Sequence, residues 1–196
     1  MTRRLVLASA SAARLATLRA SGFAPDVVVS GVDESDVTGS PVDICLELAQ
    51  RKARGVAAAT PDALVVGCDS VLEFGGQAYG KPLDAADVLD RWARMAGNTG
   101  TLHTGHCVVD TATGKEAAEV SSTLVRFGTP TAEELDAYIA SGEPLAVAGA
   151  FTIDGLGAQF VDAIDGDPGT VIGISLPLLR KLLADLGTRA TDLWTR

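Results

Sequence analysis

The amino-acid sequence predicts an α/β fold built around one hydrophobic core. Along most of the chain, segments with the pattern of strands alternate with segments that have the pattern of amphipathic helices. One run, residues 64–72, is rich in Leu, Val and Cys and lacks the polar alternation of a half-solvated strand, so we expect it to be covered on both faces. At 196 residues the chain suits one domain, or one core with two lobes.

The composition argues against several classes of function. A formal net charge of −9 makes nonspecific binding to nucleic acid or to an anionic membrane unfavourable. The apolar run at residues 5–8 is too short for a signal peptide, and no stretch approaches the roughly 20 apolar residues of a membrane span. The three cysteines are widely spaced within apolar runs, which indicates buried thiols in a reducing cytosol: Cys45, Cys68 and Cys107. We therefore expect a cytoplasmic protein.

The first strand and helix offer a candidate anion site. We expect a strand at residues 5–8 and a helix over 12–21, capped by Ser9 or Ser11. Free N–H groups at such a helix start attract anions. Arg14 lies in the first turn, where a cation has the wrong sign for the helix dipole; it is either a solvated residue or a ligand for an anion.

The next segment contains a lysine in an unexpected place. After a short strand at 26–29, the acidic loop 31–36 is either solvated or, through residues such as Glu34, a ligand for a hard divalent cation. A helix then starts at Pro41 and continues to about residue 59. Lys52 falls within its apolar arc, so its side chain either extends out to solvent along its stem or meets buried anions.

Asp69 lies where we expect the central strand to end. It either caps a turn or faces a cation or a cleft, because burying an unpaired carboxylate costs several kcal/mol. A hairpin tip at Gly75-Gly76 would fold the chain back and bring Lys81 near this carboxylate. The spacing up to Lys81 matches a P-loop, but Pro82 stands where magnesium binding needs Ser or Thr, so we reject a P-loop and keep Lys81 as a phosphate ligand.

The rest of the chain continues the alternation of helices and strands. The two histidines, His103 and His106, are an odd number of residues apart on one strand and therefore cannot chelate one metal together. The remaining elements that we expect are a helix over 84–95 capped by Asp84, strands over 101–110 and 117–127, a helix from the cap Thr131 to about 141, a glycine-rich segment at 148–157, a turn at 165–169, a strand at 171–174, a helix with one leucine face over 176–186, and a loose tail at 188–196.

Several short motifs, taken in order, resemble those of the Maf family of nucleotide pyrophosphatases, which are related to inosine triphosphatase-like folds. The resemblance covers nearly the whole chain and rests on the ordered set rather than on any single motif. The matching motifs are Leu7-Ala8-Ser9-Ala10-Ser11-Ala12-Ala13-Arg14, Val32-Asp33-Glu34, Lys52-Ala53, Gly67-Cys68-Asp69-Ser70-Val71, Gly80-Lys81-Pro82, Gly142-Glu143-Pro144, Ala148-Gly149, Asp154-Gly155 and Ile172-Gly173.

The resemblance implies a mixed twisted sheet with flanking helices and two lobes around a central cleft, formed by one domain at 1–187. It implies hydrolysis of nucleoside triphosphates to nucleoside monophosphate and pyrophosphate with magnesium or manganese, as house-cleaning of pyrimidine or modified nucleotides. Asp69 would accept a proton from water. The expected phosphate ligands are Ser11, Arg14, Lys52 and Lys81, and Glu34 would lie near the metal with Asp69.

Three positions depart from the family pattern and leave the preferred base open. Ala13 replaces the first of two arginines, Ser70 stands where many members have Thr, and Asp154 stands where many have Gln. An acceptor-only Asp154 would favour a base edge with N–H donors. Alternatives are a nucleotide-binding regulator of cell division, because the family is also linked with inhibition of septum formation, and a member disabled at Ala13. The resemblance also implies a homodimer.

Overall fold

The structure is a computed structural model that describes residues 3–195. Met1, Thr2 and Arg196, which belong to the expected domain and tail, lie outside the described residues. The described chain forms one seven-stranded sheet, in which β4 pairs with β3 beside the main order β2-β1-β3-β5-β6-β7. The strands are β1 (Arg4–Leu7), β2 (Asp26–Val27), β3 (Ala63–Phe74), β4 (Gln77–Tyr79), β5 (Thr99–Asp110), β6 (Lys115–Phe127) and β7 (Val161–Asp165).

The sheet is mixed, which confirms the predicted fold class. β1 pairs in parallel with both β2 and β3, whereas every other pairing is antiparallel. The parallel pairs need crossovers, which α1 (Ala12–Ala20) and α2 (Pro41–Ala57) supply. The antiparallel pairs β3–β4 and β5–β6 are hairpins joined by short turns.

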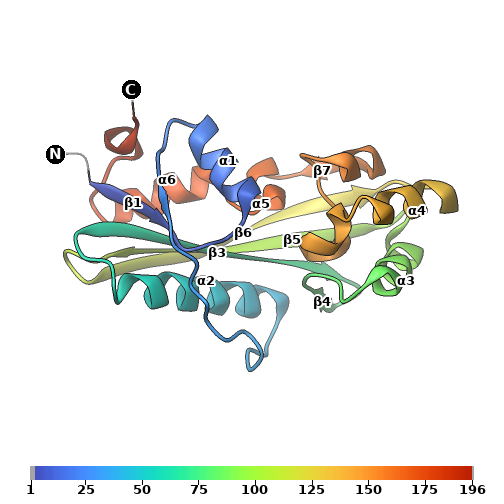
Figure 1. Cartoon of the computed structure of the whole chain (residues 1–196), viewed down its shortest axis with the longest axis horizontal. Coiled ribbons are helices and arrows are strands. Elements are labelled where there is room, and N and C mark those ends of the chain that lie inside the picture. Colours follow the sequence, from blue (N-terminus) through green and yellow to red (C-terminus); the bar gives the residue numbers. More distant parts are fainter. Residues whose placement is uncertain (1–2, 196) are drawn as a thin grey trace.

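Helices cover both faces of the sheet (Figure 1). At one end, α2 covers one face, while α1, α5 (Pro168–Ile172) and α6 (Leu176–Asp185) lie over the other. The opposite end carries α3 (Ala85–Met95) and α4 (Ala132–Ala140). Within residues 3–195, no helix combines the length and the apolar character needed to cross a lipid bilayer.

The two largest hydrophobic clusters lie along the three long strands. The first packs the leucine face of α6, including Leu179 and Leu183, against β1 and β3. The second is aromatic: Trp92 of α3 meets Phe127 edge to face, with ring centroids 5.7 Å apart. Capping residues define where the helices begin. Ser40 and Thr131, for example, both form the capping boxes that their sequences indicate.

Two glycines allow α2 to lie directly on the sheet. A Cβ at Gly67 would be 2.3 Å from the carbonyl oxygen of Ala49, and one at Gly105 would be 2.2 Å from that of Cys45. Only residues without a side chain permit so close an approach of helix and strand backbones. The glycines therefore set the distance between α2 and the central strand.

Three short segments differ from the prediction made from the sequence. The expected strand at 171–174 is wrong, because Asp167 caps a helix with Pro168 at its first position and α5 follows. The expected short strand at 26–29 ends at Val27. The edge strand β7 was missed; its side chains are at most half-buried, so it lacks a clear apolar face.

The segment expected to be a loose tail is packed as far as residue 195. Ala190–Leu193 forms a 3₁₀ helix, and Leu193 is 4 % exposed within the first core. Trp194 forms a β-bridge with Phe23, and Thr195 N donates to the carbonyl oxygen of Gly22 at 2.8 Å. Apolar side chains near the end of the chain therefore dock beside the end of α1.

We predict that Gly105→Ala destabilises the protein by about 1–3 kcal/mol or more, because α2 must move to accommodate the new methyl group. Urea unfolding followed by circular dichroism measures the change. Gly80→Ala is the matched control, since a Cβ there meets no atom within 4 Å. Equal stability of the two variants would contradict the proposed contact.

His106 makes folding sensitive to acid. Its Nδ1 donates to the carbonyl oxygen of Thr104 at 2.9 Å, and its Nε2 accepts from Ser175 N at 2.8 Å, so the buried ring is held in its neutral form. Burial lowers its pKa to about 4. Between about pH 6.5 and pH 4, the unfolded chain therefore binds a proton that the folded protein does not.

We predict that the free energy of unfolding falls by about 3 kcal/mol as the pH drops from 6.5 to 4, on account of His106. Urea titrations at half-unit pH steps measure this slope. In His106→Gln, which keeps an acceptor but cannot titrate, that part of the slope disappears. The same slope in both proteins would show that other groups produce it.

Candidate active site

A gap along one edge of β3 creates the site. On this edge β3 pairs with β1 as far as Val66 and with β4 from Leu72 onward. Between these two strands, residues 67–71 have no strand partner on this edge within the described chain, although they pair with β5 on the other edge. Asp69 therefore lies in the middle of β3, not at a strand end as we expected from the sequence, and its surroundings are open because the neighbouring strand stops.

A cavity of about 1020 Å³ opens at this gap. Its volume is at the upper end of the range of roughly 300–1,000 Å³ that is typical of small-molecule sites. All nine residues that the sequence singled out for substrate, metal or catalysis contribute to its walls: Ser11, Ala13, Arg14, Glu34, Lys52, Asp69, Ser70, Lys81 and Asp154. The sequence motifs, which are far apart along the chain, therefore meet around one space.

Lys52 lies between two carboxylates in this cavity. Its Nζ donates to Asp69 Oδ1 at 2.6 Å and lies 2.8 Å from Glu34 Oε1. The side chains of Lys52 and Asp69 are each 13 % exposed, whereas that of Glu34 is 50 % exposed. Of the two alternatives for Lys52, contact with anions is therefore the one observed.

Burial makes Asp69 a stronger base than an ordinary carboxylate. Removal from water raises the pKa of the Asp69 carboxyl, and the ammonium of Lys52 limits this rise. Lys52 thus compensates the buried charge while one carboxylate oxygen, Oδ2, remains free of this contact. A carboxylate with these properties can accept a proton from a water molecule in the cavity.

Arg14 is buried at the start of α1, with 9 % exposure, so the alternative of a solvated helix residue is wrong. Its Nε donates to the carbonyl oxygen of Gly173 at 2.8 Å, and its Nη1 and Nη2 donate to Ser9 Oγ and Ser70 Oγ, each at 3.1 Å. A guanidinium has five N–H groups, so two remain for a ligand. The arginine is thereby fixed in orientation before any ligand arrives.

A chain of hydroxyl groups fixes the direction of the hydrogen bonds of Ser70. Thr104 lies opposite Ser70 on β5, and its hydroxyl donates to the carbonyl oxygen of Thr170 at 2.7 Å. Because Thr104 has no second proton to give, the 2.8 Å contact between the two hydroxyls has Ser70 as its donor. Ser70 accordingly has only lone pairs to offer to Arg14 and to a ligand. Sequence reasoning missed Thr104; a hydroxyl inside a buried strand was the available signal.

Lys81 reaches the same cavity from the turn after β4. The expected hairpin at Gly75-Gly76 is present, but the cation in contact with Asp69 is Lys52 and not Lys81. Within residues 3–195, Lys81 forms no ion pair. Its ammonium is therefore available to an anion in the cavity.

Comparison with known proteins agrees with this site. The family model described as Maf-like protein matches residues 4–186. The chain belongs to the Maf family. Three Maf relatives illustrate the similarity, each named nucleoside triphosphate pyrophosphatase. The protein from Streptomyces coelicolor is 61 % identical over 98 % of this chain and 95 % of its own length, that from Salinispora tropica 58 % over 98 % and 88 %, and that from Nocardia farcinica 53 % over 99 % and 98 %.

The positions that depart from the Maf pattern occupy different walls of the cavity. Ala13 is on α1, Ser70 on β3, and Asp154 on the loop between Phe151 and the 3₁₀ helix Leu156–Phe160. Because Ala13 replaces the first of the two arginines of this motif, Arg14 is the arginine that the motif contributes to the cavity. These three positions therefore line one cavity from three separate parts of the fold.

Glu143 holds the loop that carries Asp154. Its Oε1 accepts from Thr152 Oγ1 at 2.6 Å and from Gly157 N at 2.9 Å, and its Oε2 accepts from Leu156 N at 2.9 Å. These hydrogen bonds lower the pKa of Glu143 although burial opposes them, so the carboxylate stays ionised. In the sequence Glu143 stood out only as part of a motif, because its hydrogen-bond partners lie up to fourteen residues away.

Residues 3–195 contain no cluster of three or more His, Cys, Asp or Glu side chains that could hold a metal with protein ligands alone. Glu34 and Asp69, however, present carboxylate oxygens to the same part of the cavity, on either side of Lys52. Magnesium is commonly bound by one or two carboxylates together with substrate phosphates. The donor set therefore fits a cation that arrives with a nucleotide.

Proposed function

We propose that this member of the Maf family hydrolyses nucleoside triphosphates to nucleoside monophosphate and pyrophosphate in the cavity beside β3. The observation that carries the proposal is the meeting of Asp69 with three cations, Arg14, Lys52 and Lys81, from four separate elements around one space of suitable volume. The names of the relatives support the same activity. The protein is accordingly a hydrolase that acts on acid anhydrides.

In this proposal Asp69 accepts a proton from the water that attacks the α-phosphorus. Its burial and raised pKa suit a general base, which must be ionised at neutral pH and yet bind a proton readily. Lys52 holds the carboxylate in place from one side. The bond from the α-phosphorus to the bridging oxygen breaks, and pyrophosphate leaves.

Four residues bind the phosphates. Arg14 offers its two remaining N–H groups, and Lys52 and Lys81 contribute ammonium groups. Ser11 accepts the Arg14 backbone N–H as a helix cap, so its own proton is free to donate to a phosphate oxygen. Positive groups at these places stabilise the charge that develops on the leaving pyrophosphate.

A divalent cation, magnesium or manganese, would offset part of the negative charge of the substrate-loaded cavity. The cavity walls carry four carboxylates, Glu34, Asp69, Glu143 and Asp154, against the three cations, so the formal charge is already negative before a triphosphate adds several further negative charges. Glu34 and Asp69 would hold the metal, which supplies neutralisation of phosphate charge when bound. Glu34 is the more accessible of the two.

The setting of the activity follows from the same proposal. Nucleotide pools and reducing conditions are both found in the cytoplasm, and the three cysteines are free and buried. We place the enzyme there, with nucleotides as its partners and without nucleic acid or membrane as partners. The homodimer implied by the resemblance stays a prediction.

We predict that Asp69→Asn lowers kcat by about 10²–10⁴-fold, because the amide cannot accept the proton from water. The measurement is the separate determination of pyrophosphate and phosphate released from a panel of triphosphates with magnesium or manganese. Asp136→Asn, an exposed position on α4, serves as the control and keeps full activity.

Two outcomes would contradict this function. Release of single phosphates instead of pyrophosphate would place the attack at a different phosphorus. Binding of triphosphates by the wild-type protein without turnover would support the alternative of a regulator of cell division, which needs phosphate ligands but no general base.

Asp154 contributes to base selection in this proposal. Its carboxylate only accepts hydrogen bonds, so it favours bases that present ring N–H or amino groups, whereas Gln both accepts and donates. We predict that Asp154→Gln changes relative kcat/KM among bases by about two- to tenfold, the worth of one hydrogen bond. The same panel, extended to methylated and hydroxylated bases, measures it; an unchanged ranking would refute this role.

A further inference from the structure

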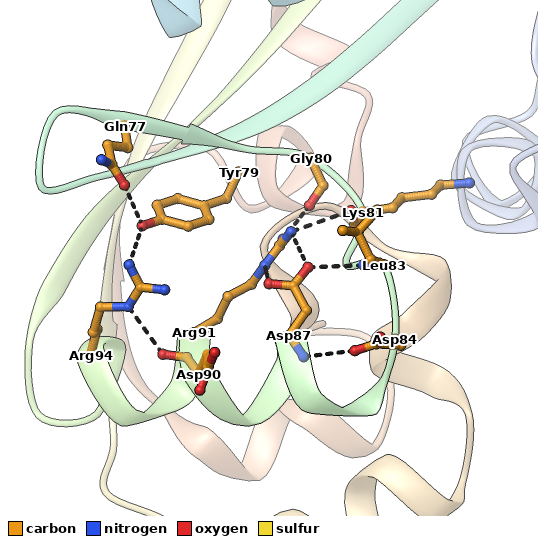
Figure 2. Close-up of polar contacts among 10 residues, drawn as sticks. All are labelled: Gln77, Tyr79, Gly80, Lys81, Leu83, Asp84, Asp87, Asp90, Arg91 and Arg94. Carbon is orange, nitrogen blue, oxygen red and sulfur yellow. Dashed lines mark hydrogen bonds and ion pairs between the residues drawn. The ribbon is translucent and has the colours of Figure 1, made fainter.

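The turn that carries Lys81 is short and lies between β4 and α3. Figure 2 shows the Lys81 side chain extending away from this turn and from the polar groups around it. Since the ammonium has no ion-pair partner within the described residues, its position depends on the backbone of residues 80–83. Whatever holds this backbone therefore sets the point from which the flexible Lys81 side chain reaches the cavity.

Two side chains one helical turn apart on α3 hold that backbone. Arg91 Nη1 donates to the carbonyl oxygen of Gly80 at 2.6 Å, and Arg91 Nη2 lies 3.4 Å from that of Lys81. Asp87 Oδ2 accepts from Leu83 N at 2.9 Å (Figure 2). The turn is thus bound on both sides of Lys81.

Arg91 is itself fixed in place. It is 7 % exposed, and its Nε and Nη2 donate to the two carboxylate oxygens of Asp87 at 2.9 and 2.8 Å. The guanidinium also lies 5.2 Å from the centre of the Tyr79 ring. An exposed i,i+4 pair contributes little, but here a buried arginine forms a two-pronged pair with a partly buried carboxylate and also binds backbone carbonyls, a defined geometry that Lys cannot reproduce.

The same carbonyl connects the turn to the opposite wall of the cavity. Gly149 N donates to the oxygen of Gly80 at 3.1 Å, so this oxygen accepts from both Arg91 and the 3₁₀ helix Ala148–Ala150. A displacement of Arg91 would therefore free the carbonyl groups of Gly80 and Lys81 from α3, leaving Gly80 with the longer contact to Gly149 and the far side of the turn with Asp87.

We propose that Arg91, with its partner Asp87, is the positioning residue for Lys81, and this rests on the proposed role of Lys81 as a phosphate ligand. Arg91 does not touch the substrate; it places the ammonium of Lys81 at the phosphate end of the site. Loss of this placement weakens binding of triphosphate and pyrophosphate more than it slows the chemical step, because Asp69 and Lys52 lie on other elements.

Arg94 provides a matched control on the same helix. Its guanidinium also lies near the Tyr79 ring, 5.8 Å from the ring centre, and its Nη1 donates to Tyr79 Oη at 3.1 Å. Within the described chain it makes no hydrogen bond to residues 80–83. Arg94→Lys therefore changes the charge geometry of α3 without releasing the Lys81 turn.

The test compares wild type, Arg91→Lys, Lys81→Ala, the double variant and Arg94→Lys. We measure KM and kcat for a triphosphate and, in parallel, calorimetric binding of inorganic pyrophosphate. We expect Arg91→Lys to raise KM and the pyrophosphate Kd about tenfold with kcat within about threefold, and Arg94→Lys to stay within about twofold. The double variant should match Lys81→Ala within about twofold, because Arg91 acts through Lys81.

Additive losses in the double variant would overturn the proposal, since Arg91 would then act independently of Lys81. So would wild-type KM and pyrophosphate binding in Arg91→Lys. If Lys81→Ala binds pyrophosphate like wild type, the role of Lys81 fails and the positioning role with it, while hydrolysis by the wild-type protein still stands. If Arg91→Lys does not fold, Asp87→Asn, which removes the charged partner of Arg91, must give the same rise in KM and the same lack of additivity.

Discussion

The ion pair between Lys52 and Asp69 is the interaction on which the rest of the site depends. A carboxylate that is largely removed from water needs a compensating charge, and here one ammonium group at 2.6 Å provides it. The pair can form only because β1 ends early and leaves the edge of β3 open, and because α2 approaches closely enough for Lys52 to reach across. Two glycines, Gly67 and Gly105, permit that approach.

Around this pair, hydrogen bonds within the protein fix the orientation of several side chains that line the cavity. Arg14 is oriented by three acceptors, and Ser70 is turned into an acceptor by Thr104. Glu143 holds the loop of Asp154 through two backbone N–H groups and one hydroxyl. Preorganisation of this kind reduces the cost of ordering side chains when a charged ligand binds.

The sequence predicted the elements of the site better than their neighbours. The short motifs identified the residues of the site, and the inward direction of Lys52 followed from helical periodicity alone, although Asp69 lies in the middle of β3 and not at the expected strand end. Thr104 and Glu143 could not be found in this way, because their roles depend on strand register and on loop contacts. The bond from Arg14 to Gly173 spans 159 residues, and no local pattern encodes it.

The fold was predicted in outline, and its errors have local causes. The hairpins, the capped helices and the leucine face of α6 carry strong local signals and were placed correctly. The region from 161 to 174 was misread, because β7 has a weak pattern and the combination of Asp167 and Pro168 begins a helix that the apolar residues after it concealed. The packed C-terminal segment depends on contacts with Phe23 and Gly22 at the other end of the chain.

The cavity has two walls that are held in different ways. One is formed by α2 and the sheet, and the other by the loops after residue 143. A helix whose backbone lies against the backbones of β3 and β5 cannot move closer to the sheet, and at this distance Lys52 reaches Asp69. The facing wall consists of short 3₁₀ turns and loops between residues 143 and 160, held by hydrogen bonds to Glu143 and by the burial of Ala150 and Phe151 in the aromatic core. Lys52 and Asp69 are therefore placed by main-chain packing, whereas Asp154 is placed by the side-chain contacts of a loop.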